Sequence, residues 1–153
     1  MINWLKKKWY GLNEINNLER LVLNAVREKI EPEARILWDK QIDKINKVSR
    51  LPHGVESIFY HINLKTGKPD FDDNIRFPNK KSDLLLAVVR LKFRTDEIEI
   101  EVWCERGRVL LLNFKGSAYY WINYLENESA NEKVITNCKV IADLMSVSSS
   151  ESD

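Results

Sequence analysis

The most regular hydrophobic pattern in the chain runs from Leu84 to Lys115, where apolar and polar residues alternate with a period of two. Such alternation is typical of strands that bury one face and expose the other. Turn signals at Thr95-Asp96 and at Glu105-Arg106-Gly107 divide the stretch into three parts. The pattern therefore predicts a meander of three antiparallel strands.

Charges indicate how the first two strands of this meander pair. With Thr95 and Asp96 as a two-residue turn, basic residues of the first strand face acidic residues of the second, and apolar residues face apolar ones. A slip of one residue would set apolar side chains against charged ones, so both faces specify the pairing. The predicted charge pairs are Arg94 with Glu97, Lys92 with Glu99 and Arg90 with Glu101. The predicted apolar pairs are Phe93 with Ile98, Leu91 with Ile100 and Val89 with Val102.

At the second turn, the sequence predicts a three-residue loop with Gly107 in the left-handed conformation. The apolar face then continues onto the third strand. The predicted pairs there are Val102 with Leu110, Ile100 with Leu112 and Ile98 with Phe114. A buried Leu, Ile or Phe contributes roughly 1.5–3 kcal/mol, against about 0.2–1 kcal/mol for an exposed cross-strand ion pair. Burial therefore stabilises the sheet, and the charges fix its register.

The part of the chain before the meander has the period of helices. Asn13 is predicted to cap a helix that runs to about Ile30. Pro32 ends that helix and favours a restart, because proline suits the first position of a new helix. The apolar stripe of the second helix continues to Val48, so we expect its end near residues 51–54. Two helices of this length can cover one face of a sheet.

Four further segments complete the predicted fold. Residues 55–63 alternate as a strand, which we expect to be the first of the sheet, and residues 65–83 form a long loop rich in turn formers. The periodicity of residues 118–125 does not separate helix from strand, and we expect an irregular or short helical segment. Residues 133–141 alternate as a last strand. The expected fold class is α+β, with N-terminal helices packed on one face of an antiparallel four- to five-stranded β-sheet.

With 153 residues, of which 44% are hydrophobic, the chain is long enough for one domain with a core. We expect a single domain over residues 1–145, opening with a short helix over residues 2–11, and a disordered serine-rich tail over residues 146–153. No apolar run approaches the roughly 18 residues of a membrane span. Lys6, Lys7 and Lys8 interrupt the N-terminus where a signal peptide is apolar, so we expect a cytoplasmic protein.

Residues suited to catalysis or metal binding are few. Cys104 and Cys138 are too few for a disulfide framework and form no zinc motif, so we expect buried thiols. His53 and His61 belong to no hydrolase or metalloprotease motif, and the chain has no Gly-rich phosphate loop. We expect a turn residue at His53 and a sheet-surface or packing residue at His61. The sequence thus predicts no catalytic residue, no cofactor and no bound metal.

One segment with the composition of a contact surface is the long loop, where Asp70, Asp72 and Asp73 form the only close acidic cluster. Carboxylates of this kind bind calcium or magnesium, but the turn glycine and terminal glutamate of a calcium loop are missing. Solvated loop carboxylates are the simplest interpretation. In a functional role, the cluster is an anionic patch for a basic partner.

A second such segment is an aromatic run that follows the meander, and it consists of Tyr119, Tyr120, Trp121 and Tyr124. Large aromatic side chains are enriched at interface hot spots. Packing in the core is the competing interpretation. We expect some of the four to be buried and at most two to be exposed.

The segment from Glu97 to Ser117, EIEIEVWCERGRVLLLNFKGS, resembles bacterial immunity proteins of polymorphic toxin systems, especially those of contact-dependent growth inhibition. In it, a charged strand ends at Trp103, turns at Arg106-Gly107-Arg108 and returns as an apolar strand that ends at Phe114. The likeness covers about 20 residues clearly and the preceding helices in outline. Many immunity proteins against nucleases are acidic, whereas this chain has a net charge of +1.

The resemblance implies a small, cytosolic, non-catalytic protein that binds a cognate toxin domain and blocks its active site or its access to substrate. It carries no functional residue over to this chain, since such families bind through divergent surfaces. The alternative function is a nucleic-acid-binding module that uses Lys6 to Lys8, Lys80, Lys81 and the row Arg90, Lys92, Arg94. That row faces Glu97, Glu99 and Glu101, which neutralise it, and the near-neutral net charge also argues against this alternative.

Overall fold

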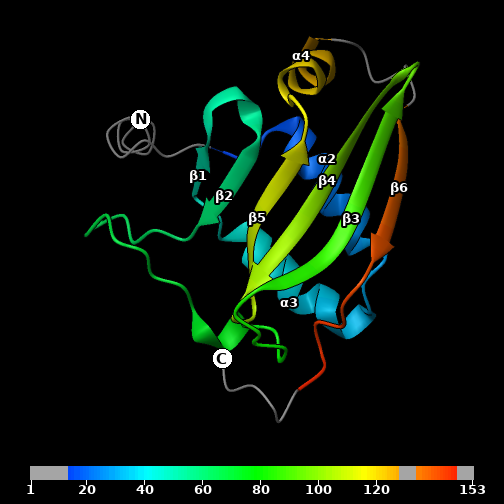
Figure 1. The fold of residues 1–153 in the computed structure, drawn as a ribbon. Coiled ribbons are helices and arrows are strands. Elements are labelled where there is room, and N and C mark those ends of the chain that lie inside the picture. Colours follow the sequence, from blue (N-terminus) through cyan, green and yellow to red (C-terminus); the bar gives the residue numbers. More distant parts are fainter. Residues whose placement is uncertain (1–13, 128–133, 148–153) are drawn as a thin grey trace.

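The computed structural model describes residues 14–127 and 134–147. Within these residues, six strands form one antiparallel sheet in the order β1-β2-β5-β4-β3-β6. Figure 1 shows helices α2 and α3 behind one face of the sheet, and the opposite face turned to the viewer without a described helix across it. The helices are α2 (Asn17–Arg27), α3 (Pro32–Asp43) and α4 (Tyr119–Asn127), with 3-10 turns η1 (Pro52–Gly54) and η2 (Asp73–Ile75). The strands are β1 (Lys47–Arg50), β2 (Glu56–Tyr60), β3 (Leu84–Phe93), β4 (Asp96–Glu105), β5 (Arg108–Lys115) and β6 (Ile135–Val140).

The predicted α+β class with an antiparallel sheet is confirmed, but the predicted number of four to five strands is wrong. The extra strand, β1, occupies the segment that the helical stripe assigns to the second helix. That helix ends at Asp43, and Val48 is buried opposite Phe59 of β2, which is therefore not the first strand. The Asn46 side chain exchanges two hydrogen bonds of 2.7 and 2.8 Å with the backbone of Ile62. This pairing, between residues 16 apart in the chain, favours an extended chain over a further helical turn.

Helix α2 is shorter at both ends than its predicted extent. Asn16 caps it, since its side chain accepts a 2.8 Å hydrogen bond from the backbone N–H of Glu19. The Glu19 carboxylate in turn accepts a 2.9 Å bond from the Asn16 N–H, which completes a capping box. The predicted cap, Asn13, lies outside the described residues. The helix ends at Arg27 instead of Ile30, while the restart at Pro32 is confirmed.

The β3–β4 hairpin has the predicted faces but a different register. Its turn consists of Arg94 and Thr95, so Arg90 pairs with Glu99 and all the predicted pairs are wrong by two residues. A turn at Thr95-Asp96 would place a β-branched threonine at the first central position, which requires positive φ. In the structure, Arg94 takes this position with φ 57°. A shift of two residues leaves every side chain on its face, so the alternation cannot detect it.

The β4–β5 turn is also one residue shorter than predicted. Arg106 and Gly107 form it with φ 49° and 82°, which confirms the left-handed conformation of Gly107 and lets Glu105 pair with Arg108. A Cβ atom at Gly107 would lie 2.6 Å from the carbonyl oxygen of Phe77, so only glycine allows the long loop to pack on the turn. A β-bulge then shifts the register, and the three predicted β4–β5 pairs are wrong. The observed pairs include Val102 with Leu112 and Ile100 with Phe114.

The core lies between the inner face of the sheet and helices α2 and α3. Val22 and Trp38 from the helices and Leu91, Ile100 and Leu112 from the strands are at most 1% exposed. Helix α4 closes the end of the sheet at which β5 ends (Figure 1). Two of its aromatic residues, Trp121 and Tyr124, join the same cluster of buried side chains. The side chains pointing to the helices therefore form one continuous core.

The buried Gln41 side chain joins three parts of the chain that are distant in sequence. Its amide nitrogen donates to the carbonyls of Ile75 in η2 (2.7 Å) and Gly107 in the β4–β5 turn (3.0 Å). Its amide oxygen accepts a 2.9 Å bond from the backbone N–H of Val109. Helix α3, the long loop and the hairpin are thus fixed to one another at this end of the sheet.

The remaining sequence predictions have different outcomes. From Tyr119 on, the segment 118–125 belongs to helix α4, and the strand predicted over residues 133–141 is confirmed as β6. The helix predicted over residues 2–11 and residues 148–153 of the predicted tail lie outside the described residues. In the part of the chain that is described, no helix has the length and apolar character needed to cross a membrane.

We predict that Ile100→Ala lowers the free energy of unfolding by about 2–5 kcal/mol, because it leaves a cavity in the core. Ile100 is fully buried in the central strand β4. Arg90→Ala serves as the control, since Arg90 forms an exposed pair with Glu99 and its loss should cost under about 1 kcal/mol. Denaturant titration measures both, and equal losses would show that the inward face is misassigned.

Candidate functional site

The carboxylates of the long loop are engaged with neighbouring residues. Asp72 caps η2, and its carboxylate lies 3.4 Å from the Lys44 ammonium. The backbone N–H of Asn74 and the Lys44 charge hold the pKa of Asp72 below its usual value. Asp73 pairs with Arg76 at 2.6 Å, while Asp70 accepts a long 3.4 Å bond from Asn63.

This loop shows no feature of a metal centre. Among the described residues, no three His, Cys, Asp or Glu side chains are grouped so that they could hold a metal ion. Asp72 and Asp73 each have a cation close by, which offsets part of the negative charge that the sequence places here. The loop therefore presents polar, largely compensated side chains.

The aromatic run divides into exposed and buried members. Tyr119 and Tyr120 are 51% and 46% exposed, whereas Trp121 and Tyr124 are 3% and 8% exposed. Tyr124 packs on Phe93 with ring centroids 4.0 Å apart. Trp121 and Tyr124 are therefore core residues and are not available for the partner contact that the composition predicts. Tyr119 and Tyr120 are available.

The structure does not bring the acidic loop and the aromatic run together. Strand β5 begins beside the long loop, where the backbone N–H of Phe77 bonds to the carbonyl of Gly107 at 2.8 Å, and it ends just before helix α4. Its eight residues span about 24 Å at the rise of an antiparallel strand. The two segments lie at opposite ends of the sheet (Figure 1). One partner can reach both only across a sheet face.

Neither histidine nor cysteine assembles into a reactive group. His61 is buried and stacked on Phe71 with ring centroids 4.6 Å apart, and burial lowers its pKa. Burial raises the pKa of the Cys104 thiol to about 12, and it also raises the pKa of the half-buried Cys138. Both thiols are therefore protonated at neutral pH and weak as nucleophiles. His53 lies in η1, as the turn prediction requires.

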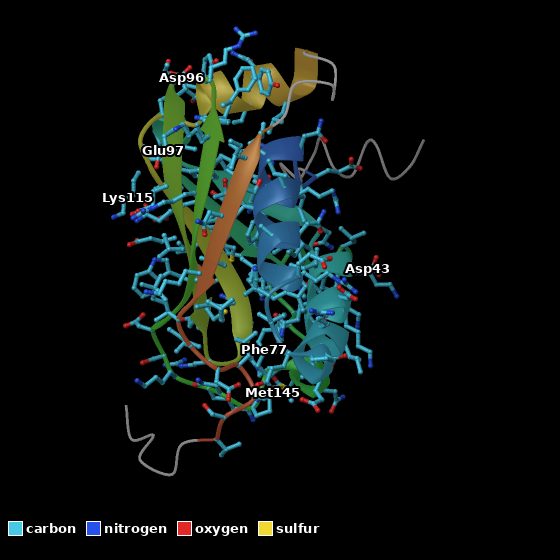
Figure 2. All side chains as sticks on the ribbon, turned by 90° about the vertical axis from the view of Figure 1, so that its right-hand side faces the viewer. Asp43, Phe77, Asp96, Glu97, Lys115 and Met145 are labelled. Carbon is cyan, nitrogen blue, oxygen red and sulfur yellow. The ribbon has the colours of Figure 1, made fainter. Side chains whose placement is uncertain are left out.

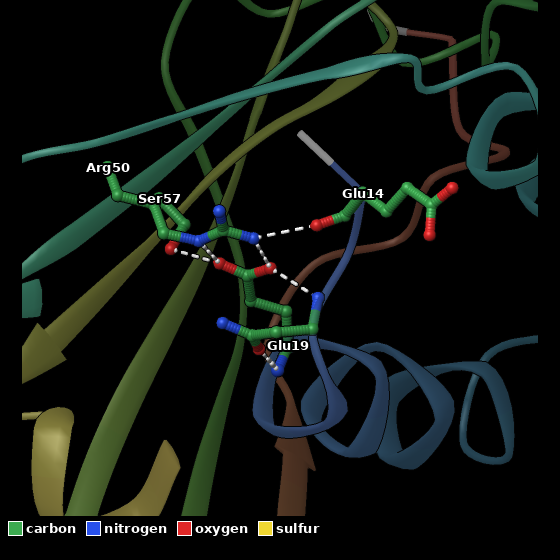
Figure 3. A network of polar contacts seen from close by, with 5 residues as sticks. Glu14, Glu19, Arg50 and Ser57 are labelled. Carbon is green, nitrogen blue, oxygen red and sulfur yellow. Dashed lines mark hydrogen bonds and ion pairs between the residues drawn. The ribbon is translucent and has the colours of Figure 1, made fainter. Parts of the chain in front are cut away.

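A buried polar network joins helix α2 to the first two strands. Figure 3 shows Arg50 and Ser57 converging on the carboxylate of Glu19. Arg50 donates to both carboxylate oxygens at 2.7 and 2.8 Å, and the Ser57 hydroxyl donates at 2.6 Å. The Nη2 atom of Arg50, which is one of these two donors, also donates to the backbone carbonyl of Glu14 at 2.8 Å. Glu19 is 1% exposed, so the guanidinium supplies the countercharge that a buried carboxylate requires.

A serine beside a carboxylate is also a nucleophile and base arrangement, which makes this network a candidate active site. Ser57 is only 3% exposed, and the carboxylate that would take its proton is held by Arg50. The hydroxyl therefore has neither access to a substrate nor a free base. We interpret the network as structural.

Two hollows lie on the helical side of the sheet. The larger, about 420 Å³, runs between α2 and α3 and is lined by Arg20, Arg27 and Asp39, among others. The Arg27 guanidinium donates two hydrogen bonds, of 2.7 and 2.8 Å, to the Asp39 carboxylate, so these two charges pair with each other. The smaller, about 260 Å³, lies between the Glu19 network and Tyr119 of α4. Neither hollow combines unpaired charges with a reactive group.

The outer face of the sheet, opposite the helices, has a feature that the sequence does not reveal. Four apolar side chains from four neighbouring strands lie next to one another across it. They are Leu85 of β3, Trp103 of β4, Leu111 of β5 and Ile58 of β2, which we call the outer apolar row. At a strand spacing of about 4.8 Å, the row is roughly 14 Å long. All four are partly exposed, although such side chains normally seek burial.

Charged and polar side chains border the outer apolar row. Glu101 accepts hydrogen bonds from the Trp103 indole N–H (3.2 Å) and Asn113 (3.0 Å), and it lies 3.5 Å from the Lys115 ammonium. Figure 2 shows Lys115 and Glu97 projecting from the sheet on the side away from the helices. The outer face thus combines an apolar centre with a charged rim.

The alternation of the sequence misses this row because of the β-bulge between Leu85 and Ala87. Strict alternation would place Leu85 on the same face as the buried Ala87 and Val89. The bulge turns Leu85 outward, where it pairs with Trp103. One signal of the row is present in the sequence. Trp103 continues the row of Glu97, Glu99 and Glu101, so alternation places it on the exposed face of the strand.

Comparison of the chain with protein-family models, with curated proteins and with solved structures finds no match.

We predict that Arg50→Met lowers the free energy of unfolding by about 3 kcal/mol, because it leaves the buried Glu19 carboxylate without its countercharge. Lys115→Met is the matched control, since the Lys115 side chain is 49% exposed and its ion pair contributes under about 1 kcal/mol. Thermal or denaturant unfolding measures both variants. Similar small losses would contradict the role of the network.

We further predict that His61 makes the fold less stable at mildly acidic pH. Its pKa is lowered in the folded protein, so below the unfolded value of about 6.5 the unfolded chain binds the proton first. Stability therefore falls as the pH drops below about 6.5, until the folded protein also binds the proton. In His61→Gln this part of the dependence disappears, with a slope difference of at most about 1.4 kcal/mol per pH unit. Parallel stability profiles of the two proteins would refute the prediction.

Proposed function

We propose that this chain is a non-catalytic immunity protein that binds a cognate bacterial toxin domain and blocks its active site or its access to substrate. The observation that carries the proposal is the outer apolar row on a sheet face without a described helix over it. The resemblance of residues 97–117 to immunity proteins supplies the class of partner. This segment contains Trp103 and Leu111, two of the four members of the row.

The composition of the outer face supports binding to another protein. Interfaces have an apolar centre from which charges are depleted and a polar rim, and tryptophan is enriched among the residues that dominate affinity. Trp103 stands between Leu85 and Leu111, so a partner side chain packed on it would also contact its neighbours. Glu101 and Lys115 form part of the rim.

The chemistry of the buried groups is also consistent with a protein that does not catalyse a reaction. The Cys104 thiol is protonated, His61 is enclosed, and the Glu19 carboxylate is held by an arginine. Each of these groups is explained by packing or by stability. The exposed features, in contrast, have the form of a contact surface.

The two segments singled out by composition fit this proposal as outer contacts. Asp70, Asp72 and Asp73 lie near one end of the sheet, and Tyr119 and Tyr120 lie at the other. A toxin that acts on nucleic acid needs a basic cleft, and the loop carboxylates would favour its approach more than its final affinity. In this proposal, the outer apolar row at the centre of the interface supplies most of the binding energy.

The test is to co-express the chain with the toxin domain encoded beside it and to measure protection and affinity. We expect protection by the wild type, and a loss of about 30-fold or more in affinity for Trp103→Ala, which corresponds to roughly 2 kcal/mol. Lys92→Ala is the control, because Lys92 is exposed on the same face outside the row. It should bind within about threefold of the wild type, as expected for a rim charge.

The possible outcomes distinguish an error in the proposed function from an error in the proposed interface. If the wild type neither protects nor forms a complex, the proposed function is wrong. If it protects and Trp103→Ala, folded by circular dichroism, binds as tightly as the wild type, the function stands and the outer apolar row is not the interface.

A further inference from the structure

Strand β6 is an open edge of the sheet. Its partner is β3, and no other described strand pairs with its outer side. The backbone N–H of Ile141 donates to Leu86 of β3 at 2.7 Å, and in an antiparallel ladder every second residue directs its backbone groups to the same neighbour. Thr136, Cys138 and Val140 therefore direct their N–H and C=O groups away from β3. Three donors and three acceptors form a regular row along this edge.

This edge has few of the features by which proteins block edge pairing. Strand β6 has six residues, contains no proline and pairs with β3 without a bulge. Its one charge is Lys139. The opposite edge strand, β1, has only four residues and two cations, of which Arg50 is fixed to Glu19. Short length and charge protect an edge, so β6 is the more open of the two.

Exposed isoleucines stand at both ends of this strand. Ile135 at its start and Ile141 just after its end are 64% and 52% exposed, among the most exposed large apolar residues of the described chain. Each is three residues from Cys138. The apolar groups are therefore placed symmetrically about the middle of the open edge.

We propose that two copies of this chain form a symmetric dimer in which their β6 strands pair antiparallel about a twofold axis at Cys138. In this register, Thr136 of each copy faces Val140 of the other, and all the outward backbone groups of both strands are satisfied. The two sheets become one continuous sheet. The interface is isologous, as a twofold axis requires.

The sequence of β6 is complementary to itself in this register. Ile135 faces Ile141 of the second copy, so the two exposed isoleucines of this edge bury one another. Lys139 faces Asn137, which avoids two like charges directly opposite each other. An unrelated strand would need its own apolar residues at both positions, whereas a second copy supplies them. These features favour a second copy over an extended peptide of another protein.

The dimer leaves the outer apolar row open, because the row spans β3, β4, β5 and β2 and the contact is made by the edge of β6. It is therefore independent of the proposed toxin binding.

The full chain is tested by sedimentation at concentrations from micromolar to several hundred micromolar. We expect a concentration-dependent dimer. Thr136→Pro removes an outward N–H that β3 does not use, and proline is tolerated at such edge positions. It should raise the dissociation constant about tenfold or more, because two of the hydrogen bonds across the axis are lost. Ile135→Lys, a surface change outside the core, should weaken the dimer similarly. Trp103→Ala, on the outer face, should leave it unchanged.

Cys138 offers a second readout that does not depend on a variant that folds poorly. Across a hydrogen-bonded antiparallel pair the Cα atoms are about 5.5 Å apart, within the range that a disulfide spans. The oxidant diamide should therefore link two chains through Cys138, identified by peptide mass analysis, and Cys138→Ser should prevent the link. A monomer throughout the concentration range would overturn the proposal. So would a dimer that is weakened by Trp103→Ala, or one that folded Thr136→Pro and Ile135→Lys leave intact.

Discussion

The arrangement of helices and sheet at one end of the molecule depends on a single buried amide, the side chain of Gln41. It is 1% exposed and bonds to the carbonyls of Ile75 and Gly107 and to the N–H of Val109. An unpaired buried polar group costs about 1–3 kcal/mol, so each of these backbone groups needs the amide. A glutamate of the same shape has no donor for the two carbonyls. The requirement is therefore for an amide, and it places β5 and hence Leu111 of the outer apolar row.

The parts of the fold that the sequence predicts have a common physical reason. The faces of β3, β4 and β5 follow from alternation except at the β-bulges beside Leu85 and Trp103, and the break before Pro32 and the left-handed Gly107 follow from backbone sterics. These are local rules. The register of both hairpins differs from the prediction because a shift of two residues preserves the faces. Turn geometry at Arg94 sets the β3–β4 register, and the shorter turn together with the β-bulge sets the β4–β5 register. Strand β1 depends on pairing with β2, which lies beyond it in sequence.

The candidate site shows a similar division. Composition identifies Asp70, Asp72 and Asp73, and it identifies the aromatic run, but it contains no information on Lys44 and Arg76 beside the carboxylates or on the burial of Trp121. The outer apolar row arises from a β-bulge and from strands brought together by the sheet order. Neither has a signal within a short window of sequence. A surface assembled from four strands becomes visible only when the topology is known.

The attachment of β1 and β2 has a consequence for motion. Strand β2 pairs with β5 over three residue pairs, from Glu56 to Ile58, and β1 pairs only with β2 among the described strands. By contrast, β3 and β4 pair along their whole length. Local unfolding costs least in the structural units that share the fewest contacts with the rest of the protein. Strands β1 and β2 are therefore the part of the sheet that opens at the lowest free energy, and their amide protons exchange with solvent while β3, β4 and β5 remain folded. Such an opening would expose the Glu19 carboxylate to water, so the ion pair with Arg50 holds this unit closed.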